Sequence, residues 1–177
     1  MGRPSGLLLL THPALARTHE VTAADGDLVA AFHAQCSADN LLRRWGRTHL
    51  TPRDLARLLA QAQCWIGLDA NERPLALVCV GPVSRQPGVA DLGLQVADDH
   101  HRCGIGTAMA RQAARIARTR GAHTLTAFTH ASNVPMLRLL DRLGPTQRTR
   151  DGPYVDVRVA LDAYAPATLP PIRSPST

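Results

Sequence analysis

The chain has 177 residues, 45% of them hydrophobic, which suits one domain with a sizeable core better than two domains. Its apolar runs are too short to span a membrane, and the leucines at 7–10 are too few for a secretory signal, which indicates a cytoplasmic protein without a membrane partner. The net charge of +6 is spread evenly along the chain, and Phe, Trp and Tyr occur only twice each, which argues against a nucleic-acid partner.

In chain order, the first half predicts a strand, two helices and an antiparallel meander. Thr51 and Pro52 form a strong helix start, with a capping hydroxyl, a proline at the first helical position and Asp54 in the first turn. The expected elements are a strand over 18–22, helices over 25–37 and 51–61, and strands over 64–68, over 75–83 and after residue 88.

The second half predicts helices that end at glycines and a closing hairpin. Gly121 and Gly144 follow the two helices, and Asp151-Gly152 is typical of a hairpin turn. The expected elements are a helix over 103–120, a strand over 122–128, a helix over 133–143 and a strand over 154–161. Residues 1–17 are interpreted as a flexible leader and the proline-rich residues 163–177 as a disordered tail, which leaves a domain over 18–162.

The most informative stretch runs from Val96 to Gly106, between an apolar strand and the long helix that follows it. Glycine lets the backbone approach a ligand closely, and the first N–H groups of a helix have no partner within the helix. Gly104 and Gly106 therefore stand at a junction suited to binding an anion such as a pyrophosphate.

The spacing of this loop resembles the acyl-CoA pyrophosphate loop of the GNAT acyltransferase superfamily, in which Arg/Gln-x-x-Gly-x-Gly/Ala follows a strand ending in valine. The predicted order of strands and helices is also that of a GNAT domain. The resemblance implies an α/β fold with a mixed, mostly antiparallel central sheet flanked by helices. It further implies an N-acetyltransferase that moves an acetyl group from acetyl-CoA, as co-substrate, to an amine of a small molecule or a protein.

The resemblance also implies which residues bind the acetyl-CoA. The strand that contains Leu94 and Val96 separates from its neighbour, and its free N–H polarises the thioester carbonyl. The backbone N–H groups of the loop hold the pyrophosphate, and they belong to His101, Arg102, Cys103, Gly104, Ile105, Gly106 and Thr107. His101 replaces the family's Arg or Gln, and Cys103 replaces a position that is commonly basic.

A second match is the segment from Asn133 to Gly144, which resembles the family's Asn-x-x-(Ala/Met)-x-x-Leu-x-x-x-x-Gly helix. The resemblance implies that Asn133 contacts the pantetheine arm of the cofactor, whereas the residue type alone equally suits a helix cap. Many relatives have a tyrosine acid where this chain has Leu140. His130, Ser132 or water are the alternatives for protonating the leaving thiolate.

Two further matches concern the acceptor. Asp91 stands where many relatives have a glutamate that deprotonates the incoming amine, although a solvated aspartate at the strand edge is an equal alternative. The segment Ser37–Trp45 resembles the first-helix region of bacterial protein-lysine acetyltransferases. Its interpretation here is structural, as a helix–turn–helix packed by Leu41 and Trp45.

The alternatives to an enzyme are a GNAT fold that binds CoA or a partner without catalysis and, more remotely, a basic nucleic-acid-binding module. The stripe of Arg111, Arg115 and Arg118 is interpreted as a solvated helix face in preference to a phosphate-binding stripe. The scattered cysteines and histidines lack ligand spacing, so we expect no metal site. A homodimer is left open.

Overall fold

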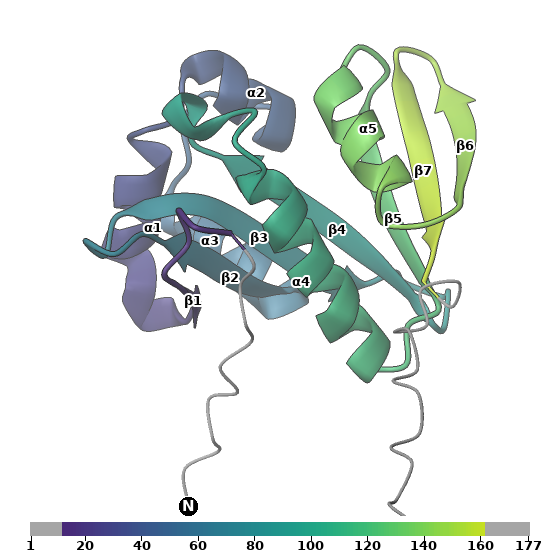
Figure 1. Ribbon diagram of the computed structural model, residues 1–177, viewed down its shortest axis with the longest axis horizontal. Coiled ribbons are helices and arrows are strands. Elements are labelled where there is room, and N and C mark those ends of the chain that lie inside the picture. The colour runs from purple at the N-terminus through teal and green to yellow at the C-terminus, as the bar shows by residue number, and fades with distance from the viewer. Residues whose placement is uncertain (1–11, 162–177) are drawn as a thin grey trace, which may run out of the picture.

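The computed structural model describes residues 12–161 and shows an α/β fold built on one seven-stranded sheet (Figure 1). The strands are β1 (Arg17–Glu20), β2 (Gln63–Leu68), β3 (Pro74–Pro82), β4 (Val89–Val96), β5 (Thr124–His130), β6 (Thr146–Asp151) and β7 (Tyr154–Ala160). The helices are α1 (Gly26–His33), α2 (Ala38–Trp45), α3 (Pro52–Gln61), α4 (Ile105–Thr119) and α5 (Val134–Asp141), with 3-10 turns at Ala23–Asp25 and Asp98–His100.

The sheet order is β1-β2-β3-β4-β5-β7-β6, and every neighbouring pair is antiparallel except β4 and β5. Alternate residues of β3 face two separate cores. Ala76 and Val78 belong to the core that contains α4 and α5, whereas Leu77 and Cys79 belong to the core on the other face, with α1 and α2. No helix of residues 12–161 is long and apolar enough to cross a membrane.

The structure confirms the α/β fold class, the meander and the closing hairpin, and it corrects the expected helix over 25–37. That helix ends at His33, and a separate helix, α2, begins after Ser37. The Ser37 hydroxyl accepts a hydrogen bond from the Asn40 N–H, so the serine caps a new helix and does not continue the old one. Within the described residues, three α-helices therefore precede β2.

The chain joins the sheet before the expected domain start at residue 18. Leu15 is buried, and the Ala16 N–H donates to the Leu68 carbonyl. The rest of the expected leader, residues 1–11, and the expected tail over 163–177 lie outside the described residues.

The feature that positions the site is the separation of β4 from β5. Their parallel ladder covers only Val89–Asp91 against Thr124–Thr126, while β3 stays paired with β4 as far as Val96. Figure 1 shows the two strands diverging beyond this short ladder. The edge of β4 after Asp91 therefore has no β5 partner for its backbone groups.

Candidate active site

The loop between β4 and α4 has the backbone geometry of an anion-binding loop. Arg102 has a φ of 62° and Gly104 a φ of 86°, both in the left-handed region. For the arginine this conformation is unfavourable, and such strain often marks functional loops. Gly104 caps α4 without any side-chain hydrogen bond, and no acidic residue lies in the first turn. The first N–H groups and the positive end of the helix dipole are therefore free of a competing carboxylate.

Gly106 is needed for close packing at the same junction. A Cβ at this position would lie 3.3 Å from Leu139 Cδ1 and 3.4 Å from Val96 Cγ2. The glycine thus lets the first turn of α4 approach both the end of β4 and helix α5. This contact places the loop directly beside the open edge of β4.

Hydrogen bonds from α2 hold the end of β4 in place. The Asn40 amide donates to the Val96 carbonyl at 2.8 Å and to the Asp98 carboxylate at 3.0 Å, and the Ser37 N–H donates to Asp98 at 2.7 Å. Burial acts to raise the pKa of Asp98, but these hydrogen bonds outweigh it and leave that pKa below its usual range. The His101 ring, 2.9 Å from the Val96 carbonyl, donates to the same oxygen.

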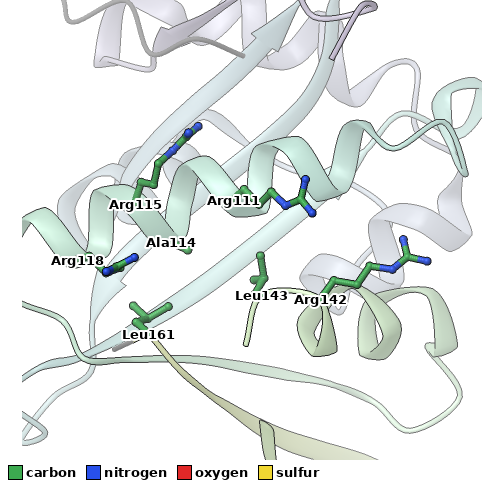
Figure 2. Close-up of a pocket in the computed structure, with 7 residues that line it drawn as sticks. All are labelled: Arg111, Ala114, Arg115, Arg118, Arg142, Leu143 and Leu161. Carbon is green, nitrogen blue, oxygen red and sulfur yellow. The ribbon is translucent and has the colours of Figure 1, made fainter. Parts of the chain in front are cut away.

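A pocket of about 440 Å³ opens beside the loop and is basic along one wall. Its lining residues are His12, Gly104, Thr107, Ala108, Arg111 and Arg142. Arg111 and Arg142 also line a neighbouring pocket between α4 and the end of α5, where Figure 2 shows Arg115 and Arg118 farther along α4. The sequence analysis treated the α4 stripe as a solvated face and missed Arg142, because only the packing of α5 brings that residue opposite Arg111.

His12 was also missed, because no local motif surrounds it. Its ring forms a hydrogen bond with the Cys103 carbonyl, so the Nε2–H donates, while the Ala14 N–H donates to Nδ1 at 3.2 Å. The imidazole Nε2 would lie 3.3 Å from a Cβ built on Gly104. The segment before β1 therefore reaches the mouth of the anion-binding loop.

Asp91 lies at the point where β4 and β5 separate, opposite Thr126 in the ladder. Part of its surface is open, yet neighbouring atoms displace enough solvent that burial raises the pKa of Asp91. The positive charge of Arg44 opposes this rise, and the negative charge of Asp156 adds to it. A carboxylate with a raised pKa beside an open strand edge is suited to accept a proton.

Asn133 and Leu140 have clear structural functions. The Asn133 side chain accepts from the Met136 N–H at 3.4 Å and donates to the Thr129 hydroxyl at 3.0 Å, so it caps α5 and ties it to β5. Leu140 is fully buried in the core. The contact between Asn133 and a cofactor stays a prediction.

The face of β5 and β7 next to Asp91 has an exposed aromatic pair that the sequence analysis missed. Phe128 and Tyr154 are 57% and 43% exposed, and their rings stack with centroids 5.0 Å apart. The His130 ring packs edge-on against the Tyr154 ring, and the Nδ1 atom of His130 lies 2.7 Å from the Ser132 hydroxyl. The pairing of β5 with β7 brings these side chains together, and the sequence pattern of one strand does not reveal which residues of another strand lie beside it.

Comparisons with known proteins agree with this geometry. The model of the acetyltransferase (GNAT) family matches residues 30–144, so the chain belongs to that family. No curated protein matches the chain by sequence.

Solved structures share the fold at low sequence identity. The GNAT domain of PAT from S. lividans superposes with a TM-score of 0.72 at 19% identity, over 81% of this chain and 89% of that one. The ribosomal-protein-alanine N-acetyltransferase of Brucella melitensis gives 0.62 at 17% identity, over 81% and 98%. The PaiA N-acetyltransferase of Thermoplasma acidophilum, solved with coenzyme A, gives 0.64 at 12% identity, over 81% and 98%. Family membership implies acyl-CoA-dependent N-acetyltransferase chemistry.

Proposed function

We propose that this protein transfers an acetyl group from acetyl-CoA to a primary amine by direct attack of the amine on the thioester. The observation that carries the proposal is the early end of the β4–β5 ladder at Asp91 and Thr126. It leaves backbone donors on β4, including the stretch from Leu94 to Val96, beside Asp91, whose raised pKa suits a base. The four cysteines form no disulfide, which favours a reducing compartment such as the cytoplasm.

The loop and the arginines beside it supply the groups that would hold acetyl-CoA. Backbone N–H groups of His101–Thr107 suit the pyrophosphate, and the dipole of α4 adds a favourable field. Arg111 and Arg142 border the pocket next to this loop, where they suit a further phosphate of the nucleotide end. The replacement of the family's residue types by His101 and Cys103 should have little effect, because backbone N–H groups make most of the hydrogen bonds to the pyrophosphate.

In the transfer step, free N–H groups of β4 stabilise the negative charge that develops on the thioester oxygen. The amine nitrogen forms the new bond to carbon while the carbon–sulfur bond breaks, and Asp91 accepts the proton that the amine loses, directly or through water. The leaving thiolate takes a proton from water. The chain presents no acid at Leu140, since that side chain is buried in the core.

The test is a titration with acetyl-CoA followed by an assay of thiol release against a panel of amines and proteins. The proposal expects saturable binding and amine-dependent release. Binding without release by any acceptor would favour a CoA-binding protein without catalysis, the alternative that buried Leu140 supports. Absence of acetyl-CoA binding would overturn both.

A further inference from the structure

Arg44 is the one cation of α2 that lies over the sheet. A Cβ built on Gly93 would lie 1.8 Å from Arg44 Nη2 and 2.6 Å from its Cζ, so the guanidinium occupies the space that any larger residue at 93 would fill. Gly93 pairs with Cys79 across β3 and β4. The charge therefore lies on the face of β4 that also presents Asp91, two residues away.

Within the described part of the chain, this guanidinium has no acidic partner in an ion pair. Of the arginines in residues 12–161, Arg44, Arg118 and Arg158 are half-buried and the others are exposed. Arg158 pairs with Asp156 at 3.8 Å, whereas Arg44 takes part in none of the ion pairs of the described chain. Its guanidinium stacks on the Trp45 ring, with Cζ 4.2 Å from the ring centroid.

A stacked guanidinium keeps its N–H donors at its edges. Stacking on Trp45 fixes the plane of Arg44 and leaves a planar fork of donors that matches a carboxylate. The nearby histidine does not supply a competing charge, because burial lowers the pKa of His33 to about 4 and keeps its ring neutral. The Asp91 carboxylate lies close enough for its pKa to respond to the charge of Arg44, yet the two groups form no direct ion pair. A carboxylate of a ligand would therefore give this half-buried, positioned cation the direct partner that the protein does not supply.

From this arrangement we infer that Arg44 binds a carboxylate of the acceptor, so that the acceptor is an α-amino acid whose amine faces Asp91. The inference rests on the proposed function. Residues two apart on a strand are about 7 Å apart. Because the guanidinium lies over Gly93, this backbone spacing sets the approximate size of the gap between the two charged groups. An amine and a carboxylate joined by one carbon fit a gap of that size when each makes a hydrogen bond of about 3 Å. Arg44 is thus a specificity-determining residue, beyond the packing function assigned to the Ser37–Trp45 segment.

The experiment compares the twenty L-amino acids with their amides and with the corresponding decarboxylated amines, using acetyl-CoA and an assay of thiol release. The amine pKa of an amino acid lies above that of its amide and below that of its decarboxylated amine. If the acid reacts faster than both, the difference therefore comes from the carboxylate and not from the fraction of amine that is unprotonated. We expect at least one acid to exceed both counterparts by tenfold to a hundredfold in kcat/KM.

Variants then assign that preference to the guanidinium. Arg44→Gln is expected to reduce the acid-to-amide ratio to within about threefold of one, and Arg44→Lys to restore part of it, with the acetyl-CoA Kd unchanged in both. Arg43→Gln is the matched control, because Arg43 precedes Arg44 on α2, is exposed and pairs with Asp39 on the same helix. It should leave the ratio at the wild-type value.

The failures of the two proposals are distinguishable. Acetylation of amides or simple amines at rates equal to the acids would overturn the inference and leave the proposed function intact. The inference also fails, without the proposed function, if acetyl-CoA binds and no amino acid is acetylated, or if Arg44→Gln keeps the wild-type ratio. Absence of acetyl-CoA binding would overturn the proposed function, and the inference with it.

Discussion

At the scale of single residues, the site separates into positions that act through backbone geometry and positions that act through charge. Gly104 and Gly106 belong to the first kind, since one adopts a left-handed φ and the other permits close packing. Asp91 and Arg44 belong to the second, and the charge of Arg44 opposes the rise in the pKa of Asp91 that burial and the charge of Asp156 produce. The two kinds call for different substitutions.

For the loop, we expect Gly104→Asp to weaken acetyl-CoA binding at least tenfold relative to Gly104→Asn. Both side chains tolerate the left-handed backbone better than most and have nearly the same size, so only the charge beside the pyrophosphate and the helix dipole differs. The measurement is isothermal titration of each variant with acetyl-CoA. If the two folded variants bind acetyl-CoA with equal affinity, the pyrophosphate does not bind at this loop.

For the base, Asp91→Asn should lower activity and raise stability. The rate should fall mostly at the lower end of the working pH range, where free amine is scarce, while acetyl-CoA binding stays near wild type. Because folding raises the pKa of Asp91, the ionised carboxylate opposes folding at neutral pH, and that cost disappears once the pH falls below the unfolded pKa of about 3.9.

Thermal unfolding and pH–rate profiles check both expectations for Asp91. The Asn variant should have the higher Tm at pH 7 and a Tm close to wild type near pH 3. A pH–rate profile that coincides with that of wild type would mean that Asp91 is only a solvated residue of the strand edge.

At the scale of elements, the sequence predicted what depends on neighbours along the chain. The helix start at Thr51 and Pro52, the hairpin turn at Asp151-Gly152 and the strand–loop–helix order before α4 are each specified within a few residues, and each is confirmed as local structure. Contacts between distant elements were not predicted. Nothing near Arg44 in the sequence indicates that it lies over Gly93, and nothing near Arg142 indicates that it lies opposite Arg111. The break between α1 and α2 was missed because the apolar pattern of α1 runs on past His33.

The connection between α2 and the anion-binding loop gives a prediction at this scale. Asn40→Ala removes the donor to the Val96 carbonyl and the acceptor for the Gln95 amide, which is buried. Unsatisfied buried groups cost about 1–3 kcal/mol, so Tm should fall by several degrees. Acetyl-CoA affinity should fall too, because the end of β4 is no longer fixed.

A control on the same helix isolates this effect. Asp39→Ala removes an exposed side chain whose ion partner is the exposed Arg43, so it should change stability by less than about 0.5 kcal/mol. Unfolding in urea and titration with acetyl-CoA measure both variants. If Asn40→Ala and Asp39→Ala behave alike, α2 does not support the loop.

At the scale of the whole molecule, the two cores meet at the sheet but differ in chemistry. The core with α4 is apolar apart from the buried amide of Gln112, which donates to the Thr18 hydroxyl. The core under α1 and α2 includes the His33 ring, the Gln95 amide and three of the four cysteines. That second core lies behind the proposed acceptor site. Its polar groups make stability depend on pH, and the same groups hold Trp45 and, through it, Arg44.

His33 should set much of this pH dependence. Burial lowers its pKa to about 4, helped by the charge of Arg44 and opposed by a hydrogen bond with Gln95. The unfolded chain binds a proton near pH 6.5, and the folded chain does so only near pH 4. Stability is therefore complete above about pH 6.5 and is lost as the pH falls toward 4. Because the ring is only half-buried, we expect a loss of about 1–2 kcal/mol.

The test measures urea unfolding at pH 7.5 and pH 4.5 for wild type, His33→Gln and the exposed control His49→Gln. Glutamine keeps a polar side chain but does not titrate, so the His33 variant should lose about 1–2 kcal/mol less than wild type between the two pH values. The His49 variant should follow wild type, since its ring is exposed and lies outside both cores. Equal pH dependence in all three proteins would show that the ring is hydrated in solution, and the neutral surroundings assigned to Arg44 would then be wrong.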